Sequence, residues 1–133
     1  MTGVQTCALP ISAIIEAATG VGLLAAPAVL ARLLLGGTLD TPAALTVARV
    51  GGTALLAISV ACWLSRENGR TLVAAMLLYN VVVAGLLVHA ALALALSGLG
   101  LWPAVILHAV MTVWCVTTLL RQPGTLPQAI HPD

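Results

Sequence analysis

Arg49, His89 and His108 are the residues of this sequence best suited to chemistry, because each interrupts a long run of Leu, Ala and Val. A guanidinium can hold an anion or polarise a carbonyl, and an imidazole can accept or deliver a proton near neutral pH. Thr53 follows Arg49 by one helical turn and would share its face. A ligand site built from these four residues would suit a quinone or a lipid headgroup, provided that the fold brings them together.

Three further polar residues, Glu16, Tyr79 and Asn80, also fall within apolar sequence. Glu16 could carry a proton or pair with a substrate; alternatively, it is a carboxylate near a helix N-terminus or a partner of Arg66 or Arg70. Asn80 could hydrogen-bond a neighbouring helix or line a pocket, and it needs a partner in either case because hydrocarbon offers no water. No catalytic group of residues is recognisable, so we expect a non-enzymatic protein.

The composition of the 133-residue chain indicates an integral membrane protein whose surroundings are the lipid bilayer. Hydrophobic residues make up 61% and charged residues 7% of the chain, whereas soluble domains carry about 25% charged residues. The net charge of +1 gives no basic patch for phosphates, which excludes a nucleic-acid partner. Lys and Phe are absent, and the bias toward residues with GC-rich codons is typical of a bacterial genome.

Four apolar runs are each long enough to cross about 30 Å of hydrocarbon, which takes about 20 helical residues. They cover approximately residues 13–35, 43–64, 71–96 and 101–120. The runs are apolar on all faces and their links are short, so the sequence predicts an all-α fold, a four-transmembrane-helix antiparallel up-down bundle over 12–121. Residues 122–133 hold three Pro and are predicted to form a flexible tail.

The Arg residues near the span ends predict the orientation, because cytoplasmic loops are enriched in Lys and Arg. Arg66, Arg70 and Arg121 fall on one side of the predicted bundle, and Arg32 falls on the other. We therefore expect a multi-pass protein of the bacterial inner membrane with both termini in the cytoplasm.

In this topology Arg49, His89 and His108 share one level near the outer side of the membrane. Each lies about six or seven residues from the outer end of its span, which is about 9–10 Å along a helix. This level could form a ligand pocket. Alternatively, the His and Thr side chains are interhelical contacts worth about 1 kcal/mol or less each, and Arg49 extends toward Asp40 or a lipid phosphate.

Pro27 and a set of small residues predict how the first two spans pack. Pro27 is expected to kink the first span and to leave the Leu23 carbonyl without its usual partner. Small residues that recur at every fourth position mark packing seams, because they let helix backbones approach closely. These residues are Ala18, Gly22 and Ala26 in the first span and Ala44, Ala48 and Gly52 in the second.

Residues 1–11, MTGVQTCALPI, match in order the translation of a common sequencing adapter. We therefore expect this segment to be an assembly artefact outside the fold, and Cys7 to carry no function. Cys62 and Cys115 show neither CxxC nor metal-ligand spacing. No metal site is predicted, and both thiols are expected to act as small packing residues.

The order of these features resembles a group of small bacterial four-span membrane proteins of unassigned function. The stretches that carry the resemblance are Glu16-Ala-Ala-Thr-Gly20 with Pro27, Ala48-Arg-Val-Gly-Gly52, Tyr79-Asn80, and Trp102-Pro103 with His108. More loosely, the plan of the spans is similar to that of the DoxX-like membrane proteins, four-helix bundles associated with quinone or redox systems. The resemblance transfers no catalytic residue to this sequence.

Three functions are open at this stage. The leading hypothesis is a protein without a resident cofactor that binds a lipid-like ligand, or that serves as a subunit of a homo-oligomer or larger membrane complex. The second is a quinone-linked redox component that uses Arg49, His89 and His108. The third is a small oligomeric transporter with Glu16 as its coupling carboxylate.

Overall fold

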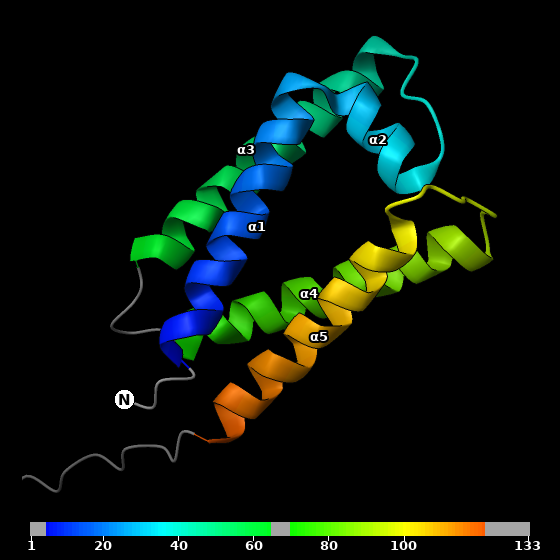
Figure 1. Ribbon diagram of the computed structural model, residues 1–133. Helices are drawn as coiled ribbons and strands as arrows, with labels where there is room; N and C mark the ends of the chain where they lie inside the picture. Colours follow the sequence, from blue (N-terminus) through cyan, green and yellow to red (C-terminus); the bar gives the residue numbers. More distant parts are fainter. Residues whose placement is uncertain (1–4, 65–69, 122–133) are drawn as a thin grey trace, which may run out of the picture.

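The computed structural model describes residues 5–64 and 70–121, and every regular element in these two ranges is an α-helix (Figure 1). The elements are α1 (Gln5–Ala25), α2 (Pro27–Leu35), α3 (Pro42–Leu64), α4 (Arg70–Leu92) and α5 (Leu101–Leu120). The all-α class predicted from the sequence is confirmed. Arg66 and the predicted tail 122–133 lie outside the described residues. The adapter-like segment contributes residues 5–11 to α1, and its origin stays a prediction.

Helices α3, α4 and α5 are each long and apolar enough to cross a membrane. They have 23, 23 and 20 residues, so each is at least about 30 Å long. Large aliphatic side chains stand on their outer surfaces, among them Val47, Leu78 and Val113. A soluble protein would bury such a surface, whereas lipid chains solvate it. This agrees with the membrane class expected from the composition.

The first predicted span is not one helix. The chain breaks at Ala26, and the axis turns by 120° between α1 and α2. Pro27 explains the break, because it has no N–H for the preceding turn and its ring would collide with the carbonyl four residues earlier. As the first residue of α2 it is well tolerated. The kink predicted within 13–35 is therefore a complete break, and the bent pair adds a fourth membrane crossing only if it is one span.

The predicted third span is shorter than expected, because α4 ends at Leu92 rather than near residue 96. The backbone N–H groups of Ala93 and Leu94 both donate to the carbonyl of His89, at 2.8 and 3.4 Å. Ala95 then adopts a left-handed φ of 52°, which continues no right-handed helix. An irregular link from 93 to 100 replaces the shorter link expected between the runs 71–96 and 101–120.

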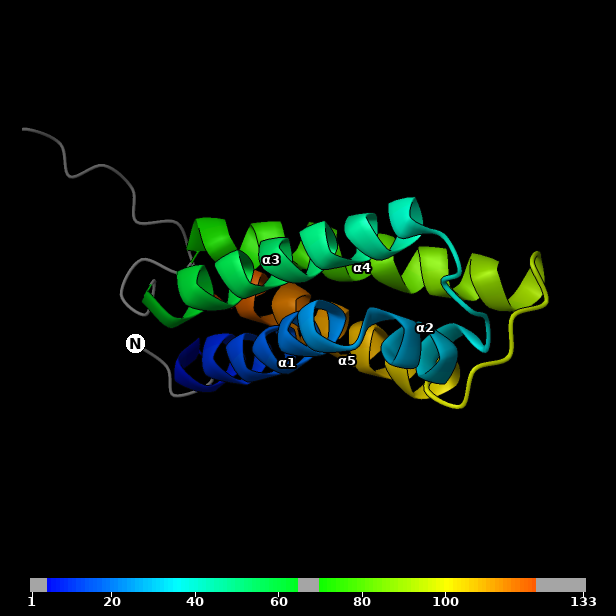
Figure 2. The same ribbon diagram turned by 90° about the horizontal axis from the view of Figure 1, so that it is seen from above.

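Two helix pairs form the body of the molecule. Helix α1 lies along α3, and α4 lies along α5 (Figures 1 and 2). Gly20 and Gly52 bring the first pair together, since a Cβ at either glycine would lie 2.8 Å from the other's carbonyl oxygen. The seam predicted at Gly52 is thus present, and its partner is Gly20 rather than Gly22.

Four helices meet in what we call the closed core, a cluster of small and sulfur-containing side chains. Its members are Ala13 of α1, Cys62 of α3, Val73 and Met76 of α4, and Cys115 of α5. Both thiols are buried and free, so they pack as the sequence predicted. Farther along the bundle, α2 and the 93–100 link meet instead. Here the Gly100 N–H donates to the Leu33 carbonyl over 2.8 Å.

Candidate functional site

A cavity of about 350 Å³ lies between α1, α2, α4 and α5. Its polar wall comes from Glu16 and Thr19 of α1, Tyr79 of α4 and His108 of α5. The rest of the lining is mostly aliphatic and includes Leu34, Val83, Leu87 and Leu107. Small-molecule sites usually combine an apolar wall with a few convergent polar groups, and this cavity has that character.

Glu16 and Tyr79 form the first polar pair of the cavity. The Tyr79 hydroxyl donates to Glu16 Oε2 over 3.0 Å, and the Glu16 side chain is only 4% exposed. Because α1 begins at Gln5, Glu16 lies near the middle of a 21-residue helix. The expectation of a carboxylate one turn from a helix N-terminus is therefore wrong. Nothing in the residue pattern indicated that Tyr79 would be the partner of Glu16.

Asn80 and His108 form the second pair, with Asn80 Oδ1 and His108 Nδ1 2.8 Å apart. The Asn80 amide is 2% exposed, and its Nδ2 donates to the Met76 carbonyl over 2.7 Å. This bond fixes Oδ1 as an acceptor, so His108 Nδ1 carries a proton and donates it. In the neutral imidazole, Nε2 is then an acceptor. Asn80 thus contacts a neighbouring helix, one of the two alternatives that the sequence left open.

The two pairs are joined through their rings. The rings of Tyr79 and His108 meet edge to face, with centroids 5.8 Å apart and planes at 74°. Tyr79 also packs against the closed core. We call Glu16, Tyr79, Asn80 and His108 the polar layer, and within it Tyr79 lies between the closed core and the cavity. Glu16, Tyr79 and His108 line the cavity. Asn80 does not line it, and it orients the imidazole of His108 through their hydrogen bond.

The sequence analysis grouped His108 with Arg49, Thr53 and His89 in one ligand site, which we call the outer cluster. The other three residues of this cluster lie away from the cavity. Arg49, Thr53 and His89 are exposed on the outer surfaces of α3 and α4. The Thr53 hydroxyl donates to the carbonyl of Arg49 in its own helix, at 3.0 Å. Of the four residues predicted to share a ligand site, only His108 lines the cavity. A ligand-binding role for the other three stays a prediction.

The level of His108 differs from the one expected. It pairs with Asn80, which lies nine residues before His89, or about 13 Å along α4. The reason is the link between the helices: α4 runs past the start of α5, and residues 93–100 lead the chain back (Figure 1). Counting residues from the predicted span ends could not reveal this offset.

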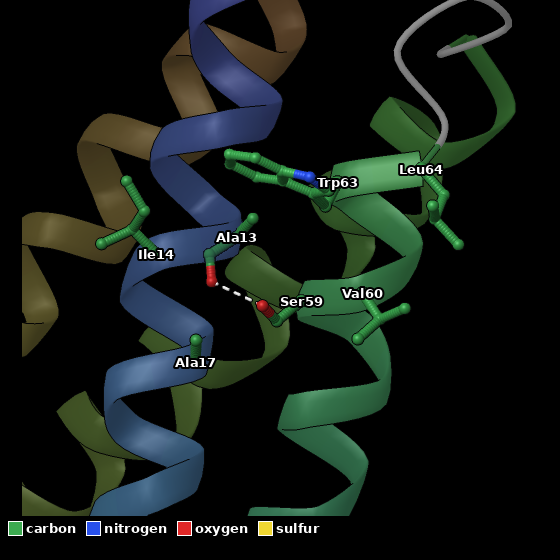
Figure 3. Close-up of a pocket in the computed structure, with 7 residues that line it drawn as sticks. All are labelled: Ala13, Ile14, Ala17, Ser59, Val60, Trp63 and Leu64. Carbon is green, nitrogen blue, oxygen red and sulfur yellow. Dashed lines mark hydrogen bonds between the residues drawn. The ribbon is translucent and has the colours of Figure 1, made fainter.

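A second pocket, of about 230 Å³, lies between α1 and α3 and has almost no polar character (Figure 3). Trp63, Ile14 and Val60 are among its lining residues. Its Ser59 hydroxyl is already engaged, because it donates to the Ala13 carbonyl over 2.7 Å. This pocket offers a ligand no convergent polar groups, so the cavity above the polar layer is the better candidate site.

Within residues 5–64 and 70–121, no group of three His, Cys, Asp or Glu is arranged to hold a metal ion. No protein-family model, curated protein or solved structure matches the chain. The site is therefore interpreted from its own geometry.

Proposed function

We propose that this chain is a multi-pass protein of the bacterial inner membrane that binds an amphipathic, lipid-like small molecule in the cavity above the polar layer. In this proposal α3, α4 and α5 each cross the bilayer, and the bent pair α1–α2 makes the fourth crossing of an antiparallel bundle. Both termini lie in the cytoplasm, as the Arg distribution favours. The protein acts by binding, alone or within a larger membrane assembly, and catalyses no reaction.

The observation that carries the proposal is a buried polar layer with unused hydrogen-bonding atoms facing an apolar cavity. Glu16 Oε2 accepts from Tyr79, which leaves the second carboxyl oxygen available. His108 Nδ1 is engaged by Asn80, which leaves Nε2 available. Neither atom is among the fully buried, unpaired polar atoms of the described residues, and both residues line the cavity, so a ligand in the cavity can reach them. The polar head of a ligand bound in the cavity would form hydrogen bonds with these atoms, and its hydrocarbon chain would pack against the aliphatic lining.

The quinone-linked redox function implied by the DoxX-like resemblance is the second candidate. The presence of Tyr79 and His108 in the cavity favours it. A quinone carbonyl, however, needs a hydrogen-bond donor, and both the Tyr79 hydroxyl and His108 Nδ1 already donate within the polar layer. With Glu16 ionised and His108 neutral, the available atoms are acceptors, which suit a hydroxyl or amine head better.

Mass spectrometry of the small molecules that copurify with the protein tests the proposal. Leu107 lines the cavity, so Leu107→Trp should fill it and remove the bound compound. The matched control is Ile106→Trp on the same helix, since Ile106 is 61% exposed and its replacement should leave binding intact. A compound retained equally by both variants would refute the cavity as the site.

Arg49→Leu completes the test, because it separates the cavity from the site predicted from sequence. Retention of the compound in this variant supports the cavity. Loss in Arg49→Leu together with retention in Leu107→Trp would overturn the proposal in favour of the outer cluster. A redox-active quinone among the compounds lost from Leu107→Trp would favour the second candidate.

A further inference from the structure

We infer that the cavity selects a lipophilic amine, which the carboxyl group of Glu16 holds, over an anionic lipid. This inference rests on the proposed function, because it assigns the chemical class of the ligand of the same cavity. Its basis is the set of charges that line the cavity and the hydrogen-bonding atoms that remain available there.

Among the described residues that line the cavity, one is acidic and none is Arg or Lys. The acidic residue is Glu16, which is buried in the cavity wall. The chain contains no Lys at all. Arg32 lines a separate pocket together with Asp40, and Arg49 is exposed on α3. A carboxyl group away from water takes up a proton unless a counter-charge keeps it ionised, and a cationic ligand would supply that counter-charge.

The hydrogen-bonding atoms point to the same class of ligand. The free Glu16 oxygen and His108 Nε2 are both acceptors when the imidazole is neutral. An ammonium group has three donors and no acceptor, so it has a donor to offer each of these atoms. A carboxylate or phosphate head would instead bring further acceptors and a like charge toward Glu16. Tyr79 keeps the carboxyl group in place through its hydrogen bond.

The shape of the cavity accounts for the lipophilic part of the ligand. Its lining above the polar layer is aliphatic, with Ile15 on α1, Val83 and Leu87 on α4, and Leu107 on α5. These side chains offer no hydrogen-bond partner, so they suit a hydrocarbon chain. The polar layer and the aliphatic lining together therefore suit a molecule with one amine and an apolar tail.

The test measures the binding of three radiolabelled probes with the same ten-carbon chain: decylamine, decanol and decanoate. The protein is reconstituted in lipid nanodiscs, and retention by empty discs is subtracted to remove simple partitioning. We expect decylamine to bind at least about tenfold more tightly than decanoate, the ratio that one charge-assisted hydrogen bond provides. Equal binding of the amine and the carboxylate, or preference for the carboxylate, would overturn the inference.

Glu16→Gln locates the selectivity. Decylamine affinity should fall about tenfold in this variant, while decanol binding should be unchanged. Asp40→Asn, which removes an exposed carboxylate outside the cavity, should leave all three probes unaffected. If Glu16→Gln does not fold, the amine-to-carboxylate ratio of the unmodified protein still decides the inference.

Leu107→Trp distinguishes failure of the inference from failure of the proposed function. If it abolishes the binding of all three probes and the unmodified protein shows no preference for the amine, the cavity is a ligand site and the inferred class is wrong. If it changes the binding of no probe, the cavity is not the site, and the proposed function fails together with the inference.

Discussion

The closed core and the cavity share helices α1, α4 and α5, yet only the core is filled. At the core, α3 is the fourth helix, and it contributes the fully buried Cys62. At the cavity that position is taken by α2 and the link before α5, represented by Leu34 and Gly100. The difference follows from Pro27, because the break before it turns α2 away from the line of α1 by 120°.

The two sides of the polar layer have different neighbours. Polar side chains that hold membrane helices together contribute about 1 kcal/mol or less each, and the two pairs of the layer could serve that purpose alone. Side chains packed on both sides would then be expected. Here Tyr79 packs against the closed core, and Glu16, Tyr79 and His108 line the cavity.

The largest expected effect comes from removing side-chain volume on either side of the layer. Met76 is buried in the closed core, so Met76→Ala should lower the free energy of unfolding by about 2–3 kcal/mol through lost packing. Leu87 borders the cavity and is only half-buried, so Leu87→Ala should cost less than about 1 kcal/mol. Unfolding by SDS titration in mixed micelles measures both. Equal losses would mean that the core and the cavity are packed alike.

A somewhat smaller effect is expected at the seam between α1 and α3. In Gly52→Ala the new Cβ would lie 2.8 Å from the Gly20 carbonyl oxygen, so the helices must separate, at a cost of about 1–3 kcal/mol. Gly51 is the control, because a Cβ there meets nothing within 4 Å. Gly51→Ala should stabilise α3 by up to about 1 kcal/mol. The same SDS titration compares them, and a stable Gly52→Ala protein would disprove the close approach.

The smallest effect is expected within the polar layer itself. Tyr79→Phe removes the hydroxyl that donates to Glu16 and should lower stability by about 1 kcal/mol. Thr53→Val is the control, because its exposed hydroxyl bonds only to the carbonyl of Arg49 in its own helix. The shift in thermal unfolding temperature in detergent should be measurable for the first variant and absent for the second. Equal shifts would argue against a Tyr79–Glu16 bond.

Much of the fold followed from composition, for a physical reason. A chain with 61% hydrophobic and 7% charged residues has to satisfy its backbone groups internally when lipid surrounds it, and helices do this within one segment. The boundaries of α3 and α5 therefore matched the apolar runs within about one residue. The first run was expected to end near residue 35, and Gly36 caps α2 there with a φ of 73°.

The candidate site could be predicted only in part. Glu16, Tyr79, Asn80 and His108 stood out because polar residues in apolar runs are conspicuous, yet their pairing was not visible. A helix that is apolar on every face gives no periodic signal for the side that faces inward. For this reason Arg49 and His89 were as plausible as His108, although both are exposed in the structure.

The sequence by itself determined the helices, their apolar surfaces and the few side chains able to do chemistry, because these depend on residue type and local spacing. The tertiary structure alone decided which of these side chains meet. The direction of α2 after Pro27, the return of the 93–100 link and the Gly20–Gly52 seam set the rotation and the level of each helix. These are contacts between residues distant in the chain, and they place Glu16 beside Tyr79 and His108 beside Asn80.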